Sequence, residues 1–165
     1  MFREMRRKNQ ALPREECLRI LNEHENGVLA LSGDDGYPYT VPLNHSCMDG
    51  NIYFHCAVEG HKLDAIRSCD KATVCVIDAD EVDAENATTR YRSVVVFGRV
   101  RLLEDENEKR RALIALGARF CPGREEAIMQ EINESIHHTG VIELTIEHIS
   151  GKENKDLARQ RRQRA

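Results

Sequence analysis

The chain of 165 residues contains no tryptophan and only four prolines. It also has no stretch approaching the roughly 20 consecutive apolar residues of a membrane-spanning helix. Its first eight residues, Met1 to Lys8, lack the apolar run of a secretory signal peptide. These absences argue against a membrane protein and against an exported one. We therefore expect a cytoplasmic protein that has no membrane partner.

The six cysteines are scattered along the chain and form no CxxC pair. Several lie in apolar runs such as Thr73 to Ile77, where a cysteine behaves as a small hydrophobic side chain. This distribution argues against a disulfide scaffold. The positions concerned are Cys17, Cys47, Cys56, Cys69, Cys75 and Cys121.

Length and charge limit the protein further. A chain of about 150 residues can bury roughly 70% of its unfolded surface, so a full hydrophobic core is feasible. The net charge of −4 argues against a nucleic-acid partner, although residues 158–164 are locally basic. We expect one domain over residues 1–150, followed by a solvated basic tail at 151–165.

The first half of the chain combines one helix with short strands. Residues 13–25 are predicted to be helical from a proline suited to the first turn, leucines at helical spacing and an Asn-Gly stop. Strands 27–32 and 37–43 flank a Gly-Asp-Asp-Gly turn, which is typical of an antiparallel hairpin. Pro38 and Pro42 cannot donate ladder hydrogen bonds, so the second strand is predicted to lie at an edge or carry a bulge. Such an edge leaves backbone groups for a ligand.

The second half continues the sheet around a pair of helices. Residues 72–77 and 91–103 are predicted strands, with Gly98 marking a bulge in the second, and the acidic stretch 78–85 between them is expected to be a solvated loop. Residues 104–118 and 124–137 are predicted helices. The last strand, 141–149, alternates apolar and polar side chains, as a half-buried strand does. Together, the predicted strands and helices indicate an α+β fold that is mainly β, an antiparallel six-stranded split barrel with flanking helices.

The segment from Asn51 to Lys62 has the layout of an anion site. A β-type run closes on Gly60, and His61 and Lys62 follow where the helical spacing of Leu63 and Ile66 begins. A helix start offers free N–H groups and a positive dipole end, and the two side chains add charge-assisted hydrogen bonds to a phosphate. On these residues alone, a solvated turn and a phosphate site both remain open.

Taken together, these segments resemble the FMN-binding split barrels related to pyridoxamine 5′-phosphate oxidase, in particular the nitroimidazole-resistance (Nim-type) branch. The resemblance extends over most of the chain. It favours the phosphate site over the solvated turn. The segments that carry it are Met5 to Lys8, Tyr39 to Asn44, Ile52 to Ala57 with Gly60 to Lys62, Tyr91 to Val94 with Gly98, and Ile149 to Lys152.

The resemblance implies an FMN cofactor at the interface of a homodimer, with different residues at each part of the flavin. Val41, Leu43 and Asn44 would lie along the isoalloxazine ring, and His55 and Cys56 along the ribityl chain. His61 and Lys62 would hold the phosphate, with Ser68 as a weaker candidate. The remaining candidates, which would reach the flavin of the other subunit, are Tyr91, Ser93 and Lys152.

The chain departs from the vitamin B6 oxidases in having no tryptophan and in ending its last predicted strand with Ile149-Ser-Gly-Lys152. Oxidation of pyridoxamine phosphate is therefore not expected. The resemblance implies an FMN-dependent oxidoreductase that uses reduced nicotinamide to reduce a nitroaromatic or quinone-like small molecule. His55 or His45 could donate a proton to the reduced acceptor, since histidine changes charge near neutral pH. Each could equally be a hydrogen-bonded structural histidine, and for His45 that alternative is favoured.

Three other functions compete with a reductase. A flavin-binding storage protein would use the same residues without turnover. A haem-binding protein on the same barrel would draw its axial ligand from the same histidines. A metal protein is disfavoured because the spacing of the candidate ligands fits no compact motif and adjacent strand residues point to opposite faces. Those ligands would be His45, Cys47, His55, Cys56 and His61.

Overall fold

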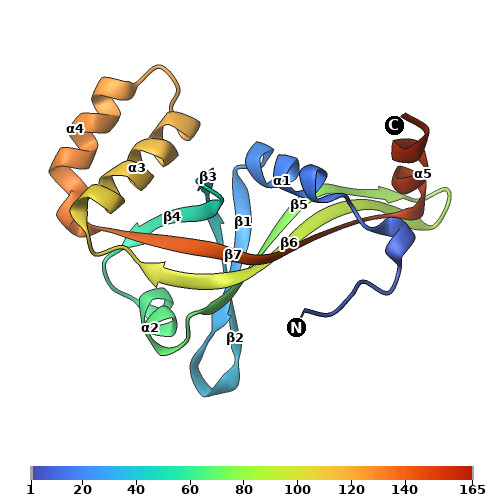
Figure 1. Ribbon diagram of the computed structural model, residues 1–165, viewed down its shortest axis with the longest axis horizontal. Coiled ribbons are helices and arrows are strands. Elements are labelled where there is room, and N and C mark those ends of the chain that lie inside the picture. Colours follow the sequence, from blue (N-terminus) through green and yellow to red (C-terminus); the bar gives the residue numbers. More distant parts are fainter. Residues whose placement is uncertain (1, 165) are drawn as a thin grey trace.

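A computed structural model describes residues 2–164, which fold into one antiparallel sheet and flanking helices (Figure 1). The sheet contains seven strands in this part of the chain, in the order β2-β1-β5-β6-β7-β4-β3. The predicted α+β split barrel is confirmed. The strand beyond the six predicted is β3, whose three residues are too short to show a periodic pattern. The strands are β1 (Asn26–Ser32), β2 (Pro38–Asn44), β3 (Ser46–Met48), β4 (Asn51–Ala57), β5 (Lys71–Asp83), β6 (Thr88–Leu102) and β7 (Thr139–Glu153).

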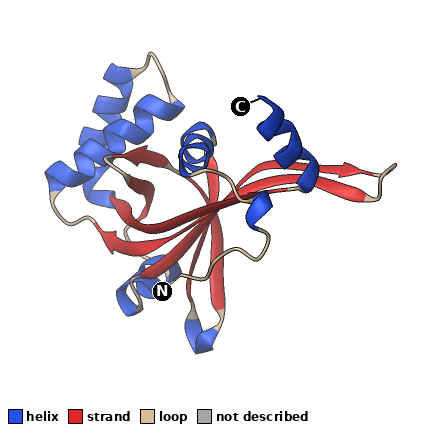
Figure 2. Cartoon of the chain, turned by 45° about the vertical axis from the view of Figure 1, so that its right-hand side comes forward, coloured by secondary structure: helices blue, strands red, loops and turns tan. Residues whose placement is uncertain are grey.

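Helices gather at both ends of the sheet (Figure 2). The α3–α4 hairpin fills the connection between β6 and β7, and α2 follows β4. No helix within residues 2–164 is long and apolar enough to cross a membrane. The α-helices are α1 (Arg14–Glu23), α2 (His61–Ser68), α3 (Glu106–Phe120), α4 (Glu125–Ser135) and α5 (Lys155–Arg164), and the short 3-10 turns are η1 (Lys8–Gln10), η2 (Asp34–Gly36) and η3 (Ile136–His138).

The two faces of the central strands have different environments. Alternate residues of β1, β5, β6 and β7 face inward and are almost fully buried beneath α1 and α2. The main core is formed by these inward residues together with apolar side chains of both helices. Its inward strand positions include Leu29, Leu31, Val74, Val76, Val94, Val96 and Ile149.

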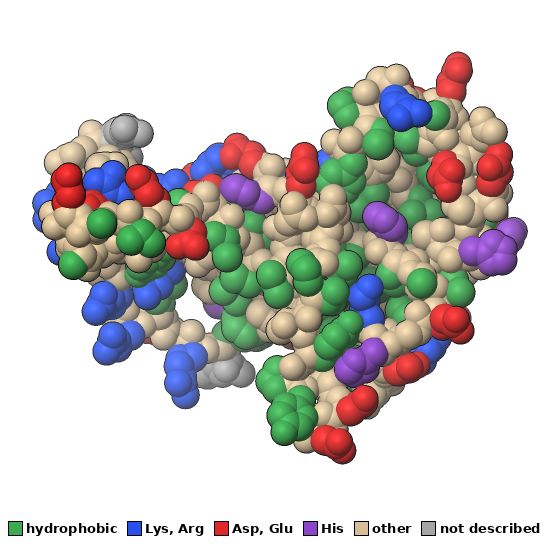
Figure 3. All heavy atoms as spheres, turned by 180° about the vertical axis from the view of Figure 1, so that it is seen from behind, with side chains coloured by type: hydrophobic (Ala, Val, Ile, Leu, Met, Phe, Trp, Pro, Cys, Tyr) green, Lys and Arg blue, Asp and Glu red, His purple; other side chains and the backbone are tan. Residues whose placement is uncertain are grey.

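The opposite face of these strands is open. Cross-strand register places Val28 beside Cys75, Cys75 beside Val95, and Ile77 beside Ser93. Several apolar members of this open face are exposed, including Ile77 at 56% and Phe97 at 37%. Seen from behind, apolar side chains gather over the middle of the molecule (Figure 3). A sheet face of this character is a candidate surface for association.

The predicted bulge at Gly98 is confirmed, because the register between β6 and β7 shifts between Phe97 and Gly98. A Cβ atom at Gly98 would lie 2.2 Å from the carbonyl oxygen of Thr145. Only glycine allows the two strands to approach this closely. The bulge lies where the sheet bends towards the barrel end.

The acidic stretch 78–85 was predicted to be a solvated loop, and this is wrong for most of it. β5 continues to Asp83 and pairs with the start of β6, forming a two-stranded arm. Arginines on the facing strand offset the repulsion between carboxylates: Arg92 contacts Asp78 at 3.1 Å and Arg90 contacts Asp83 at 3.3 Å. The sequence pattern missed these pairs because they depend on strand register.

The last strand continues past residue 150, where the predicted tail begins. β7 runs to Glu153, and the basic segment forms α5 rather than a solvated tail. The Asn154 side chain accepts a hydrogen bond from the Leu157 N–H (2.9 Å), which starts the helix. Arg161 then reaches back to the fully buried Glu153 at 2.7 Å. The basic residues of this segment therefore include one that pairs with a buried carboxylate, besides those that face solvent.

Candidate functional site

The junction between β4 and α2 is built around Gly60. Its φ of 118° lies in a region that L residues other than glycine rarely adopt, and the Gly60 carbonyl accepts from the N–H groups of Leu63 (2.9 Å) and Asp64 (3.3 Å). The N–H groups of His61 and Lys62 have no acceptor within residues 2–164. A Cβ at Gly60 would meet nothing within 4 Å, so glycine is required here by its backbone conformation and not by close packing. The junction therefore presents two free donors at the positive end of a helix dipole.

The two basic side chains of the junction lie in different surroundings. The imidazole of His61 stacks on the ring of Tyr39 from β2, with 4.3 Å between centroids, and its Nε2 lies 3.5 Å from Asp34 Oδ2 in η2. Lys62 is half-buried. Burial raises the pKa of the Cys56 thiol, and the positive charge of Lys62 opposes that shift. The ring contact with Tyr39 places His61 against the barrel face of β2.

The predicted edge position of β2 is confirmed, because β2 is the first strand of the sheet and pairs only with β1. A proline nitrogen carries no hydrogen, so Pro38 and Pro42 fit where the backbone nitrogen faces the free edge. Thr40 lies between them with the same orientation, since hydrogen-bond direction alternates along an antiparallel strand. The Thr40 N–H and the carbonyl groups of this edge are therefore available to a ligand.

The three residues predicted to line the isoalloxazine divide between the two faces of β2. Val41 and Leu43 are half-buried and pack against the main core. Asn44 is exposed and points to the other face. The structure thus places Val41 and Leu43 on the barrel face of β2 and Asn44 on the opposite face.

His55 and Cys56 also lie on opposite faces, in this case of β4. Cys56 packs against the core, whereas His55 is exposed. His55 lines a cavity of about 520 Å³ between α3 and α4, together with Leu116 and Phe120 of α3 and Ile128 of α4. The sequence named His55 without indicating this cavity, because the cavity depends on how the helical hairpin packs over β4.

Two other candidates lie away from the junction. His45 is fully buried, its Nε2 donates to the Leu21 carbonyl (2.8 Å), and burial lowers its pKa. This environment favours the structural alternative for His45 over a role as proton donor. Ser68 ends α2, about 10 Å along the helix axis from His61. The structure therefore separates Ser68 from the predicted phosphate site.

Tyr91, Ser93 and Lys152 form a separate group at the base of the arm. Ser93 pairs with Lys152 across β6 and β7, and the Lys152 ammonium lies 5.2 Å from the centre of the Tyr91 ring. Ser93 is nine residues from Leu102, the end of β6 near α2, which corresponds to about 30 Å of strand. Within one chain, this group and the β4–α2 junction do not meet. All three side chains belong to the open face of the sheet.

Sequence reasoning missed Tyr39 and Asp34 as neighbours of the site. The strand pattern identified Tyr39 only as part of β2, and the turn pattern identified Asp34 only as part of a hairpin connection. Their contacts with His61 depend on barrel closure, which brings β2 towards α2. Within residues 2–164, no three His, Cys, Asp or Glu side chains are grouped so that they could hold a metal ion.

A protein-family model for pyridoxamine 5′-phosphate oxidase matches residues 13–153. The chain belongs to this family. The match includes β1 to β7 and the β4–α2 junction, and it ends where α5 is about to begin. No curated protein matches the sequence.

Several solved structures have the same fold. Flavocytochrome Anf3 from Azotobacter vinelandii has a TM-score of 0.78 at 23% identity, over 92% of this chain and 72% of that one. An FAD- and haem-binding protein from Mycobacterium smegmatis has a TM-score of 0.76 at 25% identity, over 90% and 74%. A proposed 5-nitroimidazole antibiotic resistance protein from Bacteroides thetaiotaomicron has a TM-score of 0.73 at 18% identity, over 87% and 86%. At 18% identity, the similarity to the resistance protein shows a shared fold.

Proposed function

We propose that this protein binds a flavin through its phosphate at the start of α2 and is a reduced-nicotinamide-dependent reductase of nitroaromatic or quinone-like molecules. The observation that carries the proposal is the β4–α2 junction of a pyridoxamine 5′-phosphate oxidase family member. There, two free N–H groups meet the side chains of His61 and Lys62. FMN and FAD share the riboflavin phosphate that this junction would hold, and FMN is the cofactor that the family resemblance implies.

The surroundings of the junction fit a flavin. The charges at α2 suit a phosphate, and the free edge of β2 offers the Thr40 N–H and carbonyl groups to the polar rim of a flavin ring. Val41 and Leu43 supply apolar contact on the barrel side. A bound flavin supplies hydride uptake from reduced nicotinamide and electron delivery to an acceptor. In this proposal, His55 donates a proton to the reduced acceptor.

We further propose that two copies associate through the open face of the sheet. Ser93 and Lys152 lie on that face together with exposed apolar residues such as Ile77. In a homodimer they would approach the partner's flavin, as the family resemblance implies. An Ile77→Glu variant should shift the protein from dimer to monomer in light scattering coupled to gel filtration. Wild-type protein that runs as a monomer at micromolar concentration would contradict this part of the proposal.

The visible absorption spectrum of the purified protein tests flavin binding. A two-band flavin spectrum with one flavin per subunit is expected, and His61→Ala and Lys62→Ala should lower the flavin content. Lys155→Ala is the matched control, because it removes an exposed lysine from α5 at the other end of the molecule. Colourless protein that also fails to bind added FMN and FAD would overturn the proposal.

Turnover separates a reductase from a storage protein. The flavin-loaded protein should consume NADH or NADPH when a nitroaromatic or quinone acceptor is added. His55→Ala should retain the flavin and lose acceptor-dependent turnover. Full turnover in that variant would exclude the role given to His55, and no turnover in the wild type would leave a flavin-binding protein without reductase activity.

The cavity beside His55 favours one second candidate, a flavoprotein that also binds haem. The Mycobacterium smegmatis relative is described as an FAD- and haem-binding protein, and His55 is exposed in an apolar cavity where its imidazole could reach an iron. Titration with haemin tests this function. A sharp Soret band in the wild type and in His137→Ala, but not in His55→Ala, would favour the haem protein, whereas no specific band in the wild type would exclude it.

A further inference from the structure

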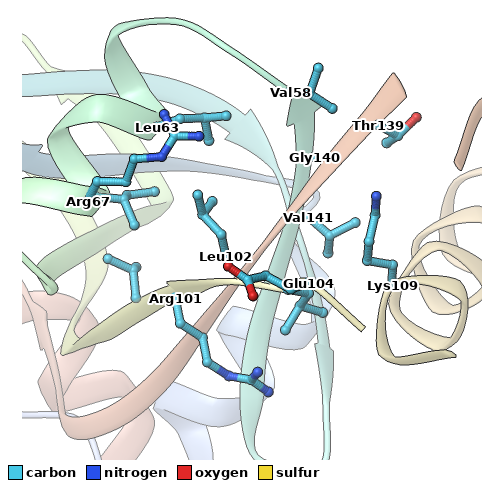
Figure 4. A pocket seen from close by; sticks show the side chains of 13 residues that line it. Val58, Leu63, Arg67, Arg101, Leu102, Glu104, Lys109, Thr139, Gly140 and Val141 are labelled. Carbon is cyan, nitrogen blue, oxygen red and sulfur yellow. The ribbon is translucent and has the colours of Figure 1, made fainter. Parts of the chain in front are cut away.

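A second cavity, of about 450 Å³, lies between α2 and the barrel ends of β6 and β7 (Figure 4). Leu63 and Arg67 of α2 bound it on one side, and Lys109 and Thr139 bound it on the other, with Leu102 between them. Its volume falls within the roughly 300–1,000 Å³ typical of small-molecule sites. None of the residues predicted from the sequence to bind a flavin lines this cavity.

The cavity begins beside the proposed phosphate site. Val58 lines it and lies two residues before Gly60, so their Cα atoms are within about 8 Å of each other. The first turn of α2 contributes to both the junction and the cavity. Lys62 belongs to the junction, and the next residue, Leu63, lines the cavity. The cavity and the proposed phosphate site are therefore neighbours at the start of α2.

The walls of the cavity suit a planar base attached to a phosphate. Apolar side chains form much of the lining, including the buried Leu63, Val100 and Val141. Three cationic residues and one carboxylate complete it, which gives the lining a positive balance in a chain of net charge −4. The charged residues are Arg67, Arg101, Lys109 and Glu104.

Arg67 is the cation best placed to meet a second phosphate. It lies on the same helix as the junction, and within residues 2–164 its guanidinium pairs only with Asp64, at 3.0 Å, with both side chains more than half exposed. Such surface pairs contribute about 0–1 kcal/mol, so a phosphate can replace the carboxylate at little cost. Arg101 is already held by Glu108 and Glu143, and Lys109 donates to the Ile136 carbonyl at 2.7 Å. These two contribute charge to the cavity, and Arg67 is the cation available for contact.

We infer that the flavin of this protein is FAD, with its adenosine monophosphate half in the cavity between α2 and β6–β7. This inference rests on the proposed function, since it extends a flavin phosphate held at the start of α2. FMN would leave the cavity empty. FAD places a second phosphate towards Arg67 and an adenine ring against the apolar wall around Leu102. The carboxylate of Glu104 supplies an acceptor for the adenine amino group or the ribose hydroxyls.

Titration of the flavin-free protein with FMN, FAD and AMP tests the inference by binding alone. We expect FAD to bind about 10- to 100-fold more tightly than FMN, the gain that burial of one additional apolar ring provides. AMP should bind to the FMN-loaded protein and should compete with FAD. Equal affinity for FMN and FAD would overturn the inference and leave the proposed function intact. Failure to bind either flavin would overturn both.

Two variants locate the adenylate. Leu102→Trp fills the cavity and Arg67→Ala removes its available cation, so each should lower FAD affinity by about tenfold or more and leave FMN affinity unchanged. Arg67 is exposed, so its variant remains informative if Leu102→Trp fails to fold. Met129→Trp is the control, because it adds the same ring to an exposed position on α4. Tight FAD binding that neither variant weakens would place the adenylate elsewhere and contradict the inference.

Discussion

The base of the arm and the β4–α2 junction both concentrate charged side chains, but the charges around Glu153 at the base of the arm pair with one another. Glu153 is fully buried, and both of its oxygens are engaged, one by Arg92 at 3.0 Å and the other by Arg161 at 2.7 Å. Arg92 also contacts Asp78, which in turn contacts His24 at 2.8 Å. These charges join α1, three strands and α5, so their role is structural.

The junction leaves its charges largely unpaired. Within the part of the chain that the structure describes, Lys62 makes no ion pair, and His61 reaches only Asp34, at 3.5 Å. A cation without a protein partner beside free N–H groups is suited to an external anion. In this protein, therefore, a high density of charged side chains does not by itself mark a binding site. Hydrogen-bonding groups without a protein partner do.

Removing the buried carboxylate of the arm should have the largest effect. Glu153→Ala leaves Arg92 and Arg161 without their shared partner and should lower the free energy of unfolding by about 3–5 kcal/mol. Chemical denaturation of the flavin-free protein measures the loss. Glu134→Ala, an exposed carboxylate on α4, is the control and should change stability by less than about 0.5 kcal/mol. A small loss in Glu153→Ala would show that the arm does not depend on this cluster.

Removing the junction lysine should affect binding rather than folding. Lys62→Ala should weaken FMN binding by about 1.5–3 kcal/mol, the range of a charge-assisted hydrogen bond. Its unfolding midpoint without flavin should match that of the wild type. Calorimetric titration with FMN tests the expected loss of affinity, and denaturation of the same preparation tests the unchanged stability. A stability loss as large as that of Glu153→Ala would remove the distinction between the two regions.

The buried His45 predicts a loss of stability in acid. Burial lowers its pKa in the folded state, so the unfolded chain binds the proton more readily. Stability should therefore fall as the pH drops below about 6.5, by up to about 1.4 kcal/mol per pH unit. Unfolding curves between pH 7.5 and pH 5 should show this slope in the wild type and in His137→Gln, and a flatter one in His45→Gln. The same slope in His45→Gln would assign the acid sensitivity to another group.

The smallest expected effect concerns the partner of His61. Asp34 is 88% exposed on the η2 turn, and its carboxylate competes with a phosphate for the imidazole. Asp34→Asn should raise FMN affinity about two- to fivefold and leave stability within about 0.5 kcal/mol of the wild type. Asp35→Asn, the neighbouring exposed carboxylate, is the control. Weaker binding in Asp34→Asn would mean that the carboxylate orients His61 instead of competing for it.

The sequence predicted those parts of the fold that local pattern determines. The edge position of β2 follows from prolines that cannot donate, and the bulge at Gly98 follows from a glycine inside a long strand. The arm and α5 were missed because they depend on pairs distant in sequence. Arg92 meets Asp78 only after β5 and β6 have found their register, and Arg161 meets Glu153 only after α5 has folded back against the end of β7.

The candidate site was predictable to a similar extent. The β4–α2 junction could be recognised from the Gly60-His-Lys62 segment at the end of a strand pattern. Its neighbours Tyr39 and Asp34 could not, since barrel closure brings them to His61. The cavities beside His55 and Leu102 depend on how the α3–α4 hairpin and α2 pack against the barrel, which periodicity does not encode.

Comparison of FMN with riboflavin most directly tests whether the start of α2 is a phosphate site. The two ligands differ only by the phosphate, so their affinity ratio in the flavin-free protein measures what the junction contributes. We predict that FMN binds about 100-fold more tightly than riboflavin in the wild type, and that the ratio falls towards one in a His61→Ala, Lys62→Ala double variant. Equal affinity for FMN and riboflavin in the wild type would contradict a phosphate site at α2.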